Sequence, residues 1–382
     1  MRFPGLLLFA LATPAALGQE GPRLVLGGEA SVSYGARDDG FFNETTYSHN
    51  LLRLLRLDLL LSLRLAGSLT LLGDLRSENL DAVRPYALYL RWRPVPEIDL
   101  DLQAGRIPPV FGAFPRRRYA QDNPLISWPL VWQYLTTLRS DAPPPDADAL
   151  LAQRGSGWLT GYPAYGYAPG LPIASAARPD TGFEGRFAEG PLALAVAVTQ
   201  GTLSDPRSSD SNDGKQVSAR IEWHPAARLK LGASVAQGEF LDARRTLPSG
   251  RFEQRAVGLD AEYSRGHLVA RAEAIYSEWD LPRRGTPPID RPLRAFGYYL
   301  EARWRFAPGW HLAARLDDLD FGEIRGSAGV TPWEAPTRRF EAGVGYLPQR
   351  HVLLKAVYQR NQRDAGLVRS QDLLASQLLL WF

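Results

Sequence analysis

The residues of this 382-residue chain that could do chemistry are charged side chains two positions apart within apolar stretches. Arg56 and Asp58 form one such pair, among leucines. A spacing of two puts both side chains on one face of a β-strand and their neighbours on the other. Around a water-filled passage, charged walls of this kind bear on which ions enter. The other charged positions are Asp74 and Arg76, Asp99 and Asp101, Arg220 and Glu222, Arg271 and Glu273, Glu301 and Arg303, and the single residues Glu341 and Lys355.

A second group of charges lies in the longest interval between alternating stretches, residues 106–180. Two interpretations are open for its arginines: they line a constriction and favour anions, or they pair with wall carboxylates such as Asp99 and Asp101 and hold the segment in place. The interval is rich in Trp, Tyr, Leu and Pro, which argues against disorder, and ordered loops of this length are usually functional. The candidate lumen or constriction residues are therefore Arg116, Arg117, Arg118, Arg139, Asp99, Asp101, Arg220, Arg271, Glu273, Glu301 and Arg303.

Hydrolytic chemistry has little support in the sequence. A nucleophilic site needs a histidine beside a serine and an acidic residue, and His49 stands away from the tight turns without an evident serine partner. Residues 210–214 are only superficially like a calcium loop, because the glycine comes one place early and no later glutamate fits. We expect no enzyme, no metal site and no cofactor, with an enzymatic barrel as the least favoured alternative. The other histidines adjoin short turns: His224, His267, His311 and His351.

The composition excludes several classes of protein. The 44 basic residues nearly balance the 41 acidic ones, so nothing points to nucleic acid as a partner. There is no cysteine and hence no disulfide framework. A bundle of transmembrane helices is excluded because each needs about 20 consecutive apolar residues, whereas this chain is 22% charged. A transmembrane barrel fits, since each lipid-facing residue alternates with a polar one.

Alternation with a period of two predicts β-strands from Arg23 to the C-terminus. In the first stretch Leu24 and Leu26 share one face, and Glu29 and Ser31 the other. With this one, the chain has about sixteen such stretches, an even number, as a single-chain bacterial barrel requires. The predicted fold is all-β: a transmembrane antiparallel β-barrel over residues 19–382, with a long loop, residues 106–180, after the fifth strand.

Short and long connections alternate between these stretches. Outer-membrane barrels show the same asymmetry, with short periplasmic turns and long external loops. The tight turns are 66–67, 94–97, 188–191, 224–227, 264–267, 307–310 and 347–350. Aromatic residues stand beside them, where an interfacial girdle is expected: Trp92, Trp223, Tyr263, Trp304, Trp310, Tyr346 and Trp381.

The two ends of the chain indicate where it is delivered. Residues 1–18 have the basic, apolar and small-residue regions of a secretory signal peptide, so the mature chain is expected to begin near Gln19. Residues 373–382 are amphipathic, with Leu378, Leu380 and Phe382 on one face. This end resembles the terminal strand of bacterial outer-membrane β-barrels, which their assembly machinery reads as a signal.

The strand count, the connectivity and the place of the long loop resemble those of the sixteen-stranded general porins. In that family the loop after the fifth strand folds into the lumen and sets the constriction, which implies the same path for residues 106–180. Residues 109–112 are weakly like the family's loop motif, with Val110 where the family has an acidic residue. The arginine triplet, residues 116–118, also departs from the family's mostly acidic loop. The resemblance therefore implies the architecture and does not transfer the selectivity.

This resemblance implies a bacterial outer-membrane channel for passive diffusion of small hydrophilic solutes or ions, and the arginines add a leaning toward anions. The implied partners are outer-membrane lipids, the barrel-assembly machinery acting on the strand that ends at Phe382, the diffusing solutes, and further copies in a homotrimer. The main alternative is a substrate-selective channel, because aromatic residues of the long loop could bind a sugar or another small solute.

Overall fold

The computed structural model describes residues 23–163, 165–209, 214–242 and 250–382. The expected signal peptide, residues 1–18, lies outside the described residues, as does most of the segment considered for calcium, residues 210–214. Within the described ranges, no helix has both the length and the apolar character needed to cross a membrane.

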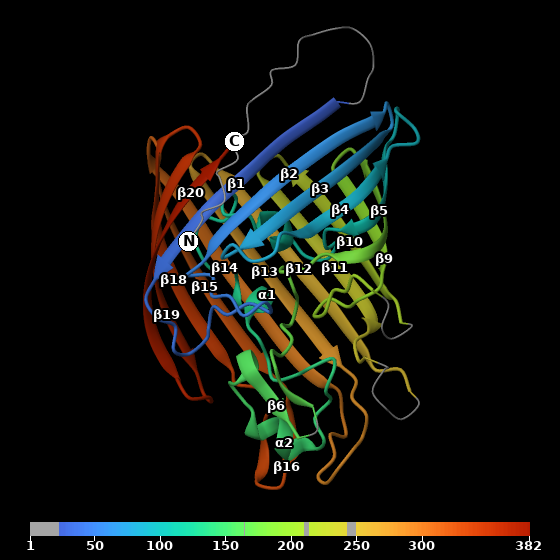
Figure 1. The fold of residues 1–382 in the computed structure, drawn as a ribbon, viewed down its shortest axis with the longest axis vertical. Coiled ribbons are helices and arrows are strands. Elements are labelled where there is room, and N and C mark those ends of the chain that lie inside the picture. Colours follow the sequence, from blue (N-terminus) through green and yellow to red (C-terminus); the bar gives the residue numbers. More distant parts are fainter. Residues whose placement is uncertain (1–22, 164, 210–213, 243–249) are drawn as a thin grey trace, which may run out of the picture.

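Sixteen antiparallel strands close into a barrel (Figure 1). The barrel is closed by β1 and β20, which pair from Glu29 opposite Trp381 to Gly35 opposite Ala375. The predicted all-β class and the antiparallel barrel of sixteen strands are thus confirmed. The barrel strands are β1 (Arg23–Gly35), β2 (Leu55–Ala66), β3 (Leu69–Glu78), β4 (Arg84–Trp92), β5 (Asp99–Ile107), β8 (Asp180–Glu189), β9 (Leu192–Thr199), β10 (Gln216–Ala226), β11 (Leu229–Glu239), β12 (Glu253–Arg265), β13 (Leu268–Trp279), β14 (Leu293–Ala307), β15 (Trp310–Phe321), β18 (Thr337–Gln349), β19 (Val352–Arg363) and β20 (Ser370–Trp381).

The apolar face of each strand lies on the outside of the barrel. On β19, Leu354 and Tyr358 are exposed, whereas Lys355 between them is buried inside. Leu259 and Leu374 are 66% and 65% exposed on the outer wall. Apolar surface spread over every strand is far more than a soluble monomer exposes, and it fits a wall that faces lipid chains.

The tight turns gather at one end of the barrel, the turn end, and the long connections at the other, the loop end (Figure 1). Gly266 and Gly309 sit in two-residue turns with φ of 59° and 76°, a left-handed conformation that glycine adopts without strain. Beside these turns Trp310 stacks on Tyr346 with ring centroids 4.2 Å apart. The predicted grouping of aromatics next to the tight turns is therefore seen at this pair.

Residues 108–179 leave the wall between β5 and β8 and form what we call the inserted loop. Its bounds lie slightly inside the predicted 106–180 because the pairing of the two strands continues to Ile107 opposite Asp180. Its α-helix α1 (Leu130–Gln133) lies within the barrel, and α2 (Ala147–Ala152) lies beyond the loop end (Figure 1). The loop contains η1 (Phe114–Arg117), α1 (Leu130–Gln133), α2 (Ala147–Ala152), η2 (Gly157–Leu159), β6 (Thr160–Tyr162) and β7 (Gly166–Ala168).

One long connection differs from expectation. The sequence of residues 317–336, polar and containing proline, predicts a long connection, but β15 continues to Phe321 and a short hairpin follows it. The hairpin consists of β16 (Glu323–Gly326) and β17 (Gly329–Pro332), and Trp333 after it is fully buried. The apolar residues of this segment pack under the inserted loop, which is why it is ordered rather than a solvated turn.

The hydrophobic core lies inside the barrel, between the inserted loop and the wall. Phe114 of η1 and Trp132 of α1 belong to the same buried cluster as Ile275 of β13 and Leu319 of β15. Burial of an aromatic or aliphatic side chain stabilises by about 1.5–3 kcal/mol, so this cluster fixes the loop before any charged contact is counted.

Candidate functional site

The arginine triplet connects the inserted loop to three separate strands of the wall. A 3₁₀-helix turns once in about three residues, so consecutive side chains leave η1 and its C-cap about 120° apart. Neighbours in sequence can therefore reach strands that are far apart around the barrel. The ion pairs are Arg116 with Glu222 on β10, Arg117 with Glu301 on β14 at 3.0 Å, and Arg118 with Asp74 on β3 at 2.6 Å.

Glu301 is the centre of a buried charge network. Besides Arg117, it contacts Arg271 of β13 at 3.2 Å and Arg315 of β15 at 3.5 Å. Arg315 also pairs with Glu341 of β18 at 2.6 Å. The structure thus brings together the predicted lumen residues Arg117, Arg271 and Glu301, and each arginine here has a carboxylate partner.

Two other predicted residues are held in different ways. Glu273 of β13 accepts hydrogen bonds from the backbone N–H of Ala113 at 2.8 Å and from the indole N–H of Trp132 at 3.1 Å. Arg220 of β10 stays within the wall, where it donates to Asp260 of β12 at 2.6 Å. Glu273 therefore anchors the loop, whereas Arg220 braces neighbouring strands.

Asp99 and Asp101 lie at the turn end of β5, away from the triplet. Both pair with Arg93, each at 3.0 Å, and Asp99 is largely exposed. They are therefore not the partners that one interpretation gave to the loop arginines. Arg303 lies on β14 two residues after Glu301, and its Nε is buried without a hydrogen-bond partner.

Arg139 points into the inserted loop and not toward the wall. It pairs with Asp141 at 2.8 Å and donates to the carbonyl oxygens of Thr160 and Gly166 at 2.9 and 2.6 Å. Its side chain is almost completely buried. Arg139 thus holds the β6–β7 hairpin of the loop against its first half.

Some anchors have main-chain partners that sequence reasoning did not identify. Lys355 of β19 donates to the carbonyl oxygens of Ala120 and Asn123 at 2.6 and 2.7 Å. Glu29 of β1 accepts from the backbone N–H of Ala120 at 2.9 Å. The sequence shows that Lys355 and Glu29 are charged residues on the polar faces of their strands. It does not show that their partners are backbone groups, because a backbone group is present at every residue.

Hydrogen bonds join the inserted loop to most of the wall. They reach eleven of the sixteen barrel strands: β1, β3, β4, β10, β11, β12, β13, β14, β15, β18 and β19. A loop with so many fixed points around the circumference is a folded body inside the lumen. It leaves less free space than a loop attached along one side of the wall would.

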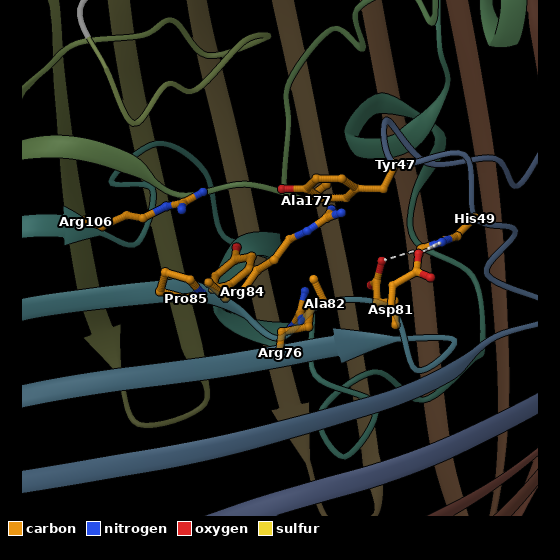
Figure 2. Close-up of a pocket in the computed structure, with 11 residues that line it drawn as sticks. Tyr47, His49, Arg76, Asp81, Ala82, Arg84, Pro85, Arg106 and Ala177 are labelled. Atoms are coloured by element: carbon orange, nitrogen blue, oxygen red, sulfur yellow. Dashed lines mark hydrogen bonds and ion pairs between the residues drawn. The ribbon is translucent and has the colours of Figure 1, made fainter.

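Free space remains at the loop end of β3, β4 and β5. A cavity of about 160 Å³ lies there, and a wider one of about 460 Å³ shares Tyr47, Arg84 and Arg106 with it. We call the two cavities together the vestibule. Arg84 and Arg106 reach into it from β4 and β5, whereas Tyr47 reaches in from the connection after β1 (Figure 2).

His49 also lines the vestibule. Its Nδ1 lies 3.1 Å from Glu78 and its Nε2 lies 3.1 Å from Asp81, so both ring nitrogens face carboxylates (Figure 2). Across the described ranges, no group of three or more His, Cys, Asp or Glu side chains is arranged to hold a metal ion.

The titration of the loop groups shows how the interior affects charge. Burial lowers the pKa of Arg116, and the nearby Arg186 acts in the same direction. Burial raises the pKa of Asp122, against the opposite effect of Arg117 and Arg271. Arg116 keeps more than a third of its side chain exposed, as does Arg186. Each of the two also has a carboxylate partner, Glu222 for Arg116 and Glu184 for Arg186, so the charge beside η1 is largely matched.

A closed sixteen-stranded barrel with a charged interior and a long loop folded inside it defines a porin-type barrel. Known protein families and curated proteins give no match to the sequence. Solved structures do match, and they show that the fold is that of the bacterial outer-membrane porins.

Three of these structures illustrate the likeness. The outer-membrane channel DcaP of Acinetobacter baumannii is 13% identical, with 97% of this chain and 100% of that chain covered and a TM-score of 0.59. OmpF of Salmonella typhi is 15% identical, with 95% and 98% covered and a TM-score of 0.58. OmpT of Vibrio cholerae is 9% identical, with 96% and 99% covered and a TM-score of 0.56. At such identities the likeness is one of fold.

Proposed function

We propose that this protein is an outer-membrane porin, a channel for passive diffusion of small hydrophilic solutes or ions. The observation that supports it best is the division of side chains by the closed barrel, apolar outside and charged inside. Barrels of sixteen to eighteen strands are wide enough for an aqueous channel. Solutes enter at the loop end through the vestibule and pass along the inner wall beside the inserted loop.

Planar-bilayer recording of the purified protein tests this function. Detergent-solubilised protein is expected to insert and to raise the conductance in discrete steps. A membrane that stays as tight as one without protein contradicts the proposal. The same preparation supports a swelling assay in liposomes with a graded series of neutral sugars, which measures the size limit for passage.

A substrate-selective channel is the second candidate, and the anchoring of the inserted loop favours it. The inserted loop is hydrogen-bonded to eleven strands around the wall. It therefore crosses the lumen and narrows it more than a loop bonded to one side of the wall would. A selective channel admits one solute well and rejects others of equal size, whereas a general porin sorts solutes by size alone. Swelling rates for solutes of matched size and different chemistry separate the two.

Location and assembly belong to the same proposal. The protein crosses the inner membrane by a signal peptide at residues 1–18, and its β20, which leads to Phe382, engages the barrel-assembly machinery. Pairing of β20 with β1 completes the closed sheet, which supports a role for this strand in assembly. OmpT of Vibrio cholerae has been solved in a trimer form, and we extend a homotrimer to this protein. Light scattering of the purified protein in detergent measures its oligomeric state.

The leaning toward anions also stays a proposal. Each arginine of the triplet has a carboxylate partner on the wall, so the triplet adds little net charge at η1. A preference for anions therefore needs arginines that are not neutralised in this way.

A further inference from the structure

Three arginines of the vestibule have no such carboxylate partner. Arg84 begins β4, Arg106 lies near the end of β5, and Arg178 comes at the end of the inserted loop. Within the described ranges, none of the three forms an ion pair. The Nε atoms of Arg106 and Arg178 are buried and have no hydrogen-bond partner. A buried N–H donor without an acceptor destabilises the fold unless a ligand or a water molecule supplies that acceptor.

Tyr47 organises two of these arginines. The guanidinium of Arg84 lies 5.0 Å from the centre of its ring, and that of Arg178 lies 4.5 Å from it. Cation–π contacts of this kind hold a guanidinium in place without neutralising its charge. The aromatic ring thus lets two like charges lie close together. Arg178 also donates from Nη2 to the carbonyl oxygen of Thr46 at 3.3 Å, which leaves its Nε as the donor without a partner.

The acidic residues that line the vestibule have partners of their own. Their carboxylates are therefore not free to cancel the three arginines. The ion pairs are Glu78 with Arg56 at 2.8 Å and Asp205 with Arg207 at 3.1 Å. Asp81 contacts His49 at 3.1 Å, a contact that is an ion pair only when the histidine is protonated, and Asp242 has a contact of its own.

Arg76 lines the narrower cavity of the vestibule and offers it a hydrogen-bond donor, although its charge is matched by a carboxylate. It pairs with Asp58 at 2.6 Å and lies over the ring of Tyr86, at 4.4 Å from its centre. Its Nη2 is buried and has no hydrogen-bond partner. An anion in the vestibule thus finds a further donor at the inner side of the narrower cavity, which Arg76 lines (Figure 2).

We propose that the vestibule binds small oxyanionic solutes, carboxylates or phosphates, through Arg84, Arg106 and Arg178 before they pass the inserted loop. This inference rests on the proposed channel function and names its substrate class. Guanidinium groups bind such oxygens through paired, charge-assisted hydrogen bonds. These groups repel cations, and a neutral sugar accepts only hydrogen bonds that lack an anionic acceptor and are therefore weaker. The site thus selects by charge at the entrance and not at the arginine triplet.

The test uses inorganic phosphate as the probe and two triple variants of the full chain. One variant carries Arg84→Gln, Arg106→Gln and Arg178→Gln. The matched control carries Arg251→Gln, Arg291→Gln and Arg325→Gln, three exposed arginines of other loop-end connections. Both variants lose the same charge, so a difference between them reports the site and not the net charge. Glucose serves as the neutral comparison solute.

Two readouts separate the site from the channel. Binding of phosphate to the detergent-solubilised protein is followed by ³¹P NMR titration, and reduction of the chloride current by phosphate added from the loop end is followed in bilayers. Loss of the charge-assisted bonds is expected to raise the half-saturating phosphate concentration about tenfold or more in the vestibule variant. The control variant is expected to behave as wild type, and glucose to have no effect.

The outcomes are distinguishable. Phosphate binding without any conductance contradicts the proposed channel and leaves the site standing. Conductance with equal phosphate sensitivity in wild type and vestibule variant overturns the site and leaves the channel standing. An equal loss in both triple variants also overturns the site, since net charge alone then explains the effect.

Discussion

Arg118 of the inserted loop and Asp74 of β3 lie 2.6 Å apart, both almost completely buried inside the barrel. The Arg118 guanidinium also stacks on Tyr86, 3.2 Å from the ring centre. The hydroxyl of Tyr119 donates to the same carboxylate at 2.8 Å. The carboxylate of Asp74 accepts from two donors, and the guanidinium of Arg118 is held against an aromatic face. Neither side chain can therefore change its rotamer easily. This pair therefore fixes the start of the inserted loop to the opposite side of the lumen from Glu222 and Glu301.

Arg118→Gln is expected to lower the free energy of unfolding by roughly 3–5 kcal/mol, because it leaves Asp74 buried without its charge partner. Urea unfolding in lipid vesicles, followed by tryptophan fluorescence, measures the change. The control is Arg360→Gln, which breaks a pair with Asp372 in which both side chains are about half exposed. Exposed pairs contribute about 0–1 kcal/mol. Equal effects of the two substitutions would contradict the role given to the buried pair.

The charge of the triplet can be tested apart from its structural role. Arg116→Ser removes the most exposed of the three side chains and leaves Glu222 with Arg220 and Lys230. The lumen beside η1 then becomes less basic, so the zero-current potential in a salt gradient is expected to move toward cations. Changing all three arginines to Ser uncovers three carboxylates and is expected to move it further. An unchanged potential in both variants removes the triplet from any account of selectivity.

The barrel could be predicted from the sequence because every strand follows the same alternation of apolar and polar residues. Lipid outside and water inside force alternation on every strand, and Leu354, Lys355 and Tyr358 of β19 show it as clearly in sequence as in space. Closure by β20 was predictable for a related reason, since an apolar strand that ends on Phe382 needs a partner. The tight turns followed from glycine and proline, whose backbone preferences are local.

The interior was not predictable to the same degree. Ile275 and Leu319 lie on inward faces, and only the inserted loop supplies the aromatic residues that cover them. Arg118 and Arg139 are the same residue type on the same loop, yet one reaches the wall and the other stays inside the loop. The direction of each side chain depends on the local turn of η1 and on the packing of the β6–β7 hairpin, which side-chain type does not encode.

The vestibule shows the same limit for a binding site. Tyr47, Arg84 and Arg178 come from three separate connections or strand ends, so no spacing in the sequence links them. The sequence pointed to the arginine triplet because three adjacent charges are conspicuous. In the fold those charges are matched by carboxylates, whereas the scattered arginines around Tyr47 are not.

Lys355 tests whether the middle of the loop is held by the wall. Lys355→Met keeps the length of the side chain and removes the donor, so the carbonyl oxygens of Ala120, Asn123 and Leu125 lose a shared partner. Hydrogen–deuterium exchange is expected to increase in residues 119–125, because local opening becomes easier. Lys230→Met is the control: within the described residues its ion pair is with Glu222, which contacts the loop at Arg116 and not at residues 119–125. Exchange that rises equally in both variants would contradict the anchor.

Glu334 gives the loop end a dependence on pH. It lies after β17, fully buried, and accepts from the backbone N–H groups of Thr137 and Gly155, both at 2.6 Å. Burial raises its pKa above the ordinary value of 4.5, although these hydrogen bonds act in the opposite direction. Tyr134 and Tyr162 are the titratable groups that face it most directly.

The sign of the effect follows from that direction. A carboxyl whose folded pKa is raised contributes stability that is fully present below its unfolded pKa and is lost as pH rises through the folded pKa. Protection of the Thr137 and Gly155 amides against exchange, corrected for the intrinsic rate, is therefore expected to be higher at about pH 4 than at about pH 8. Glu334→Gln has nearly the same shape and no titrating proton, so its protection should not change with pH. Retention of the full pH dependence by this variant would show that another group is responsible. Glu334→Ala is expected to weaken the protection at both pH values, because the amides of Thr137 and Gly155 lose their acceptor.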